Sequence, residues 1–313
     1  MTDHESKKTH VIAIVGPTCT GKTALSIRLA RQLDGEVIGC DSRNIYKYMD
    51  IGTAKPTTDE QCGIPHHMFD VTEPDQTYTV AQYKDAATQI AREILGRGRV
   101  PIICGGTGLY ARALLEGLDI PSVPPQHELR QSLTELADRE GNEALHQKLT
   151  DVDPVTAARL NANDRFRIIR ALEVSLTAGK PFSELTARHD PEFDVTWIGL
   201  LFDDRELLKR KIAERMQAQL DAGLMPEIES LLARYGRTRA LMKAVNYHEF
   251  SDYLEGKHTF DAAVEESVRH NYQLARRQLM WFRTNSAINW FAVDKIPAEQ
   301  IYREALRLVS SKH

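Results

Sequence analysis

Apolar runs of strand length recur along the first third of the chain. Residues 10–16 read HVIAIVG, and residues 36–41 (EVIGCD) and 100–106 (VPIICGG) have the same character. Short continuous apolar runs rich in β-branched residues are typical of strands buried on both faces of a parallel sheet. Residues 24–33 and 80–95 instead space their apolar positions as a helix does. The alternation predicts an α/β fold with a parallel sheet flanked by helices.

The middle of the chain has a different pattern. Strand signals stop near residue 119, and amphipathic helical patterns such as HELRQSLTELADRE and RFRIIRALEVSLTAG replace them. A strand pattern returns at 195–202 (VTWIGLLF), and helical patterns follow in 205–235 and 260–282. We therefore expect an inserted all-helical domain. The predicted divisions are 1–118 for the first part of the α/β core, 119–189 for the insertion, and 190–313 for the second part of the core with C-terminal helices.

Composition gives little sign of a membrane or secreted protein. The hydrophobic content of 42% is ordinary for a globular chain, and the N-terminal sequence MTDHESKKTH lacks the apolar segment of a signal peptide. No apolar stretch approaches the roughly 20 residues that a membrane helix needs. The four cysteines form no C-x-x-C pair, which argues against a zinc site or a disulfide framework. We expect a cytoplasmic protein with no membrane contact.

Charge indicates nucleic-acid binding only locally, because the net charge is −4. Basic side chains gather in two stretches, which contain Arg165, Arg167 and Arg170, and Arg269, Arg276, Arg277 and Arg283. Solvated helix faces explain most clusters of this kind. RNA contact is the alternative, and composition alone does not decide between them.

A phosphate-binding motif follows the first predicted strand. The pattern G-x-x-x-x-G-K-[ST] is matched by Gly16, Pro17, Thr18, Cys19, Thr20, Gly21, Lys22 and Thr23. Such a loop turns successive N–H groups toward one concavity, while Lys22 neutralises phosphate oxygens and Thr23 can bind Mg²⁺. The loop reads charge and shape, so three functions remain open: an ATPase or GTPase, a small-molecule kinase, and a transferase with a diphosphate leaving group.

Two further polar residues follow predicted strands. Asp41 should project into the crevice at the strand ends, with the phosphate loop on a neighbouring strand. It could hold Mg²⁺ through water, act as a general base, or cap the turn that contains Ser42. Thr107 lies within Gly105-Gly106-Thr107-Gly108, where an NTPase would carry a metal-binding carboxylate. The glycines suggest close approach of the backbone to a ligand, or a plain tight turn.

Seven segments together resemble the tRNA dimethylallyltransferase family, also called tRNA isopentenyltransferase. They span almost the whole chain in the family's order: GPTCTGKT (16–23), DSRNIYKYMDIGTAKP (41–56), GIPHHMFDV (63–71), GGTGLYARALLEGL (105–118), NDRFRIIRALEV (163–174), DDRELLKRKIAERM (203–216) and ARRQLMWFR (275–283). The resemblance implies a sheet like that of P-loop NTPases. It also implies transfer of a dimethylallyl group from dimethylallyl diphosphate to N6 of the adenosine 3′ of the anticodon in tRNAs that read UNN codons.

The resemblance implies roles for individual residues. Asp41 would be the general base, Thr107 would orient the N6 amine, and Arg215 would neutralise the departing diphosphate, with Mg²⁺ as cofactor. The helical insertion would grip the anticodon stem-loop of a tRNA, and we expect a monomer. The residues that would contact tRNA are Asp41, Ser42, Arg43, Asn44, Phe166, Arg167, Arg170, Lys243, Tyr247 and His248.

The chain departs from the family pattern at a few positions. Asn44 stands where a glutamine is common, and Lys211 stands where an arginine is usual. Asn246 replaces a glycine, and His270-Asn271 replaces a threonine-arginine pair. Lysine lacks the bidentate fork of arginine, and asparagine adopts a left-handed backbone less readily than glycine. These departures affect the expected details of tRNA and diphosphate binding and leave the implied chemistry unchanged.

Three rival functions share parts of this pattern. An isopentenyltransferase acting on free adenine nucleotides would also use the phosphate loop and Asp41. A small-molecule P-loop kinase would use Asp41 as a base toward an alcohol. An RNA-binding module with a purely structural phosphate loop would need no catalysis.

Overall fold

The computed structural model describes residues 9–186 and 188–311. The chain divides into two compact units, which are Met1–Leu114 with Glu192–His313, and Leu115–Pro191. We call them the core unit and the helical unit. The predicted insertion, residues 119–189, lies inside the helical unit. No helix in the described ranges is long and apolar enough to cross a membrane.

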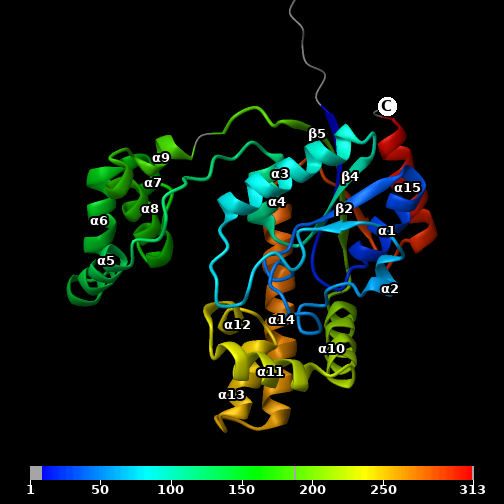
Figure 1. The fold of residues 1–313 in the computed structure, drawn as a ribbon. Helices are drawn as coiled ribbons and strands as arrows, with labels where there is room; N and C mark the ends of the chain where they lie inside the picture. Colours follow the sequence, from blue (N-terminus) through cyan, green and yellow to red (C-terminus); the bar gives the residue numbers. More distant parts are fainter. Residues whose placement is uncertain (1–8, 187, 312–313) are drawn as a thin grey trace, which may run out of the picture. The chain divides into compact units, whose positions relative to one another are not determined.

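The core unit is built on a six-stranded sheet in the order β3-β2-β4-β1-β5-β6, in which every pair of neighbours is parallel (Figure 1). The strands are β1 (Thr9–Val15), β2 (Gly35–Gly39), β3 (His66–His67), β4 (Val100–Gly105), β5 (Phe193–Leu201) and β6 (Asn289–Ala292). The predicted α/β fold with a parallel sheet is confirmed. β3 and β6 were not predicted because they are too short to give an apolar run.

Helices cover both faces of the sheet because right-handed crossovers join its parallel strands. On one face, α1 (Lys22–Leu33) and α15 (Ala298–Ser310) enclose an apolar cluster that includes Ile14 and Leu29. On the other face, α3 (Val80–Gly96) packs against β2 and β4, and its Tyr83 stacks on Tyr110 of α4 (Gly108–Leu115). Val11 to Val15 of β1 are consequently 0% exposed.

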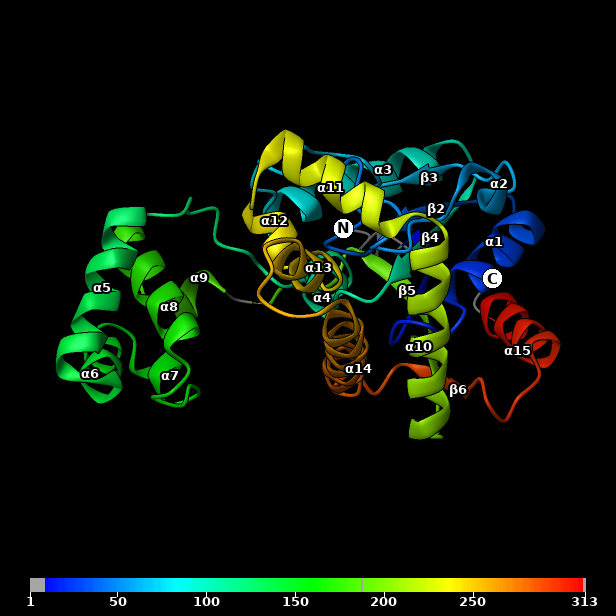
Figure 2. The same cartoon turned by 90° about the horizontal axis from the view of Figure 1, so that it is seen from below.

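Most of the remaining helices of the core unit follow β5, and they include the side-by-side pair α10 and α14 (Figure 2). Residues 205–235 form two helices rather than one continuous helix, because Gly223 between them has a left-handed backbone with φ of 100°. The elements are α10 (Arg205–Asp221), α11 (Leu224–Tyr235), α12 (Arg239–Met242), α13 (Tyr247–Leu254) and α14 (Phe260–Phe282), and a short α2 (Thr58–Gln61) lies earlier in the chain.

The helical unit contains no strand among its described residues. Its helices are α5 (His127–Glu140), α6 (Asn142–Val152), α7 (Pro154–Ala157), α8 (Arg165–Ala178) and α9 (Phe182–Leu185). Leu145, Leu149 and Leu172 are fully buried in its apolar centre. Glu173 is also fully buried, and its carboxylate accepts hydrogen bonds from Arg130 and Arg170. Burial alone would raise the pKa of Glu173, but these bonds outweigh it and the net pKa lies below the ordinary value.

Candidate active site

The phosphate loop connects β1 to α1 at the carboxyl end of the sheet. Gly16 has a φ of 137°, and a Cβ there would lie 2.2 Å from the carbonyl oxygen of Leu200, so only glycine fits. Lys22 opens α1, and its ammonium donates to the carbonyl of Pro17 over 2.5 Å. Burial lowers the pKa of Lys22 below its ordinary value, although Cys104 and Asp41 oppose this shift. The loop therefore presents a poorly hydrated cation suited to phosphate oxygens.

Asp41 lies two residues beyond the end of β2. The sheet order places β4 between β1 and β2, so the expectation that Asp41 and the phosphate loop lie on neighbouring strands is wrong. The two flank the end of β4 and line the same cavity. The Asp41 carboxylate accepts a hydrogen bond from the Arg43 amide over 2.8 Å, which closes a short turn. One carboxylate oxygen thus fixes the turn.

Thr107 ties the turn after β4 to the turn after β2. Its hydroxyl accepts a hydrogen bond from the Ser42 amide over 3.0 Å, and its own amide donates to the Cys40 carbonyl over 3.0 Å. The glycines around it face protein atoms. A Cβ at Gly105 would lie 2.1 Å from Cys40, and one at Gly108 would lie 2.8 Å from Trp281. The glycines thus allow close packing of the chain on itself.

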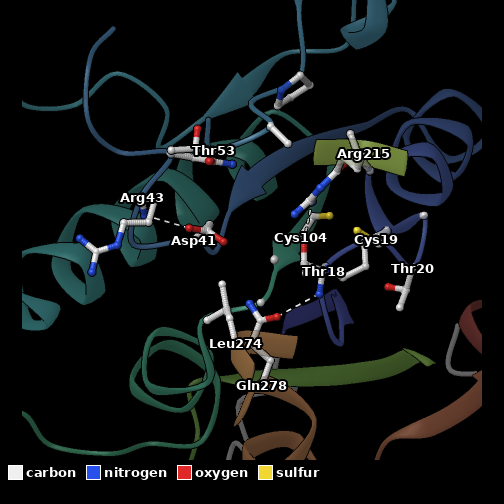
Figure 3. Close-up of a pocket in the computed structure, with 18 of the residues that line it drawn as sticks. Thr18, Cys19, Thr20, Asp41, Arg43, Thr53, Cys104, Arg215, Leu274 and Gln278 are labelled. Carbon is white, nitrogen blue, oxygen red and sulfur yellow. Dashed lines mark hydrogen bonds between the residues drawn. The ribbon is translucent and has the colours of Figure 1, made fainter. Parts of the chain in front are cut away.

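Arg215 reaches the phosphate loop from α10. One guanidinium nitrogen donates to the Thr18 hydroxyl over 2.6 Å, and another donates to the Asn271 side chain over 3.2 Å. Figure 3 shows the guanidinium directed at Thr18, on the side of the pocket that also contains Cys19 and Cys104. Arg215 and Lys22 therefore line the same cavity as the loop.

Gln278 of α14 is a site residue that the sequence analysis did not single out. Its side-chain oxygen accepts a hydrogen bond from the Thr18 amide over 2.9 Å (Figure 3). A Cβ at Gly106 would lie 2.2 Å from the Gln278 amide nitrogen, so this side chain fills the gap between β4 and the loop. The available signal was a polar residue on the buried face of α14, four positions before the buried Phe282.

Lys22, Asp41, Arg215 and Gln278 line a cavity of about 260 Å³ within the core unit. One water needs roughly 15 Å³ on the same measure, so the cavity can hold a diphosphate. In Figure 3, Asp41 and Arg43 lie across the open space from Thr18 and Arg215. The arrangement brings a carboxylate and a cationic phosphate cradle to one site, although Asp41 and Arg215 are far apart in sequence.

The expected tRNA-binding residues of the core unit differ in their exposure. Lys243 is exposed, and Arg43 is half-buried with its guanidinium 3.4 Å from the Ala240 carbonyl. Asn44 and His248 are half-buried, and each has one buried polar atom without a partner among the described residues. Tyr247 is fully buried, and its hydroxyl donates to Glu227 over 2.6 Å. Core packing therefore encloses the Tyr247 ring, and its expected contact with tRNA stays a prediction.

The expected tRNA-binding residues of the helical unit lie on α8. Phe166 is 68% exposed, which is unusual for a large apolar side chain. Arg167 is exposed and pairs with Asp164 over 3.2 Å. Arg170 pairs with the buried Glu173 over 2.6 Å, so this carboxylate already neutralises part of its charge. Phe166 and Arg167 are the more accessible candidates.

Two other features of the sequence have structural roles. His67 contacts the carboxylate of Glu36 over 2.6 Å, and the described residues contain no cluster of three or more metal-binding side chains. Lys211 is exposed and pairs with Glu214 over 2.7 Å, outside the residues that line the cavity. The departure at position 211 thus does not alter the phosphate cradle.

The fold and the loop define a P-loop α/β protein. The IPP transferase family matches residues 44–285, and the isopentenyl transferase family matches residues 9–70. The tRNA dimethylallyltransferases of Thermomicrobium roseum and Carboxydothermus hydrogenoformans are 43% and 42% identical to the chain. Each alignment covers 93% of this chain, with 88% and 94% of the respective relative. The chain belongs to the tRNA dimethylallyltransferase family of enzymes, which confirms the resemblance found in the sequence.

Solved structures agree with this assignment. The full-length tRNA isopentenylpyrophosphate transferase of Bacillus halodurans has a TM-score of 0.73 and 36% identity, with coverage of 98% of this chain and 97% of that chain. A eukaryotic dimethylallyltransferase acting on tRNA has a TM-score of 0.80 and 25% identity, with coverage of 95% and 78%. The similarity therefore extends over nearly the whole chain.

Proposed function

We propose that this enzyme transfers a dimethylallyl group from dimethylallyl diphosphate to N6 of the adenosine 3′ of the anticodon in tRNAs reading UNN codons. The observation that carries the proposal is the shared cavity of Asp41 and the phosphate loop. A diphosphate in the loop and a nucleophile at the carboxylate would meet there. The N6–carbon bond forms, the bond from carbon to the diphosphate oxygen breaks, and diphosphate leaves.

Asp41 acts as the general base in this proposal. The N6 lone pair of adenine is delocalised into the ring, so the amine is a weak nucleophile until its proton is removed. The Asp41 carboxylate is half-buried and, among the described residues, accepts a hydrogen bond from the Arg43 amide through one of its oxygens. The other oxygen can accept the N6 proton, and Thr107 orients the amine beside it.

The leaving group is stabilised by the opposite wall of the cavity. Backbone amides from Cys19 to Thr23, the Lys22 ammonium and the Arg215 guanidinium supply donors and positive charge to the diphosphate. Mg²⁺ fits this site because it is usually held by few protein oxygens together with phosphates and water. The exposed Thr23 hydroxyl, on the first turn of α1, would hold the ion, which lowers the negative charge on the departing diphosphate.

Recognition of tRNA is assigned to surfaces on both units. Asp41, Arg43 and Asn44 line the cavity, where they can meet an extruded base, and Ser42 lies between them in the sequence. Phe166 offers an exposed ring for base stacking, and Arg167, Arg170, Lys243 and His248 offer charge or hydrogen bonds to phosphates. Tyr247 supports the loop at Gly52 through packing and its bond to Glu227.

The test is incubation of the purified enzyme with Mg²⁺, dimethylallyl diphosphate and an unmodified tRNA that reads a UNN codon. Mass spectrometry of the digested tRNA should detect N6-dimethylallyladenosine. A matched tRNA with guanosine 3′ of the anticodon should give none. Failure with every UNN-reading tRNA would contradict the proposal, and product formed on free AMP alone would favour the free-nucleotide enzyme.

A further inference from the structure

Two departures from the family pattern contact each other inside the core unit. The amide nitrogen of Asn271 donates to the side-chain oxygen of Asn246 over 2.8 Å. Asn246 is 1% exposed and Asn271 is 5% exposed, so neither carboxamide has bulk water as an alternative partner. A buried polar group without a partner would destabilise the fold. Each asparagine therefore provides a hydrogen-bond partner for the other, and the two departures from the family pattern depend on each other.

The pair of asparagines is hydrogen-bonded to Arg215. The side-chain oxygen of Asn271 accepts from Arg215 over 3.2 Å, while its nitrogen donates to Asn246 and to the Ser267 carbonyl, the latter over 2.9 Å. A carboxamide has one acceptor oxygen and one donor nitrogen. Because both acceptors lie on one side, only the observed orientation turns the oxygen toward Arg215.

Asn246 is also held by hydrogen bonds to residues other than Asn271. Its side-chain nitrogen donates to the Gly52 carbonyl over 3.0 Å and to Gln219 over 3.3 Å. Its backbone amide donates to Glu249 over 2.7 Å, and Glu249 contacts His270 over 2.5 Å. The backbone of Asn246 has φ of 79° and ψ of −48°, outside the left-handed helical region that asparagine favours. The hydrogen bonds hold Asn246 in that conformation.

We propose that Asn246 and Asn271 are positioning residues that form a carboxamide relay and hold Arg215 toward the phosphate loop. The inference rests on the proposed function, in which Arg215 binds the diphosphate. Arginine has many rotamers, and fixing its guanidinium beforehand reduces the entropy lost when the ligand binds. A neutral carboxamide also leaves the full positive charge of Arg215 available, whereas a carboxylate at position 271 would neutralise it.

The test measures binding of inorganic diphosphate with Mg²⁺ by calorimetry. The variants are Asn271→Ala and Asn246→Gly, each alone and combined with Arg215→Ala. Glycine at position 246 accepts the positive φ, so this variant removes the relay with little backbone strain. Asn289→Ala is the control, because Asn289 also donates to a carbonyl, that of Trp197, but lies outside the cavity.

Each relay variant should weaken diphosphate binding about fivefold, which corresponds to one ordinary hydrogen bond of about 1 kcal/mol. The Michaelis constant for dimethylallyl diphosphate should rise, while tRNA affinity stays unchanged. In the Arg215→Ala background, neither substitution should weaken binding further. Three results would overturn the relay. The first is wild-type affinity for diphosphate in both variants, and the second is the same loss of diphosphate affinity when Arg215 is already alanine. The third is a loss of tRNA affinity as large as the loss of diphosphate affinity. The proposed function fails separately, if the wild-type enzyme forms no prenylated tRNA.

Discussion

The guanidinium of Arg215 donates to the hydroxyl of Thr18 over 2.6 Å. This contact joins α10 to the phosphate loop, and a second bond to Asn271 holds the same guanidinium from α14. An arginine at the rim of a phosphate loop adds charge where a diphosphate carries its negative oxygens. The loop is thus part of a site that two distant segments, α10 and α14, complete.

Arg215→Lys should weaken binding of dimethylallyl diphosphate. Lysine keeps the charge but cannot donate to Thr18 and Asn271 at once, so the cation loses its fixed position. We expect the Michaelis constant for the donor to rise roughly tenfold, as for loss of one charge-assisted hydrogen bond. Steady-state kinetics at saturating tRNA measure it. Lys211→Ala is the control, because Lys211 lies outside the cavity, and an equal effect there would contradict the argument.

Gly16→Ala should destabilise the fold and remove diphosphate binding. The added Cβ would lie 2.2 Å from the Leu200 carbonyl oxygen at a φ of 137°, so the loop or β5 must move. Thermal unfolding should show a clearly lower midpoint. Gly96→Ala is the matched control, because a Cβ at Gly96 meets nothing within 4 Å. Equal midpoints for Gly16→Ala and wild type would mean that the loop tolerates the side chain.

The sheet and the phosphate loop could be predicted because their signals are local. β1 is an unbroken apolar run followed at once by the loop, and Gly16 and Gly21 mark the turns that the loop needs. Tertiary contacts give no such signal. The bond between Gln278 and the Thr18 amide joins α14 to the loop. The periodicity of α14 indicates that Gln278 is buried, but it does not indicate that Thr18 is its partner.

The burial of individual polar residues could not be predicted from the sequence either. Tyr247 was expected on an RNA-facing surface, but α13 turns its ring inward onto Gly52. Asn246 and Asn271 looked like separate departures until the fold placed them in contact. Which face a short helix buries depends on its neighbours, so the periodicity of α13 over only two turns could not decide it.

Phe166→Ala should weaken tRNA binding without altering stability. Its ring is 68% exposed on α8, so little core packing is lost, while one stacked base would contribute about 1–3 kcal/mol. Fluorescence anisotropy with a labelled anticodon stem-loop would measure a roughly tenfold or greater loss of affinity. Leu176→Ala on the same helix is the control, since Leu176 is also exposed, at 44%. Equal effects of both substitutions would remove the case for stacking.

The affinity for inorganic diphosphate should fall as the pH rises, and the fall should begin at a lower pH than it would for a lysine with an ordinary pKa. Burial lowers the pKa of Lys22, so its ammonium loses its proton below the usual lysine value of 10.5. The protonated form binds the anion, and affinity is therefore lost as pH rises through the lowered pKa. Calorimetry across the alkaline range would reveal this step. Lys22→Arg should abolish it, because arginine stays charged, and a step that persists in this variant would assign it to another group.

Asp41→Asn tests the central claim, that this carboxylate takes the N6 proton. Asparagine is nearly isosteric and can still accept from the Arg43 amide, so the turn and the cavity should persist. The measurement is the single-turnover rate of prenyl transfer, with tRNA and dimethylallyl diphosphate affinities measured in parallel. We predict a rate lower by roughly 10²- to 10⁴-fold with both affinities retained. A near-normal rate, or a loss explained entirely by weaker tRNA binding, would contradict the role of Asp41 as the base.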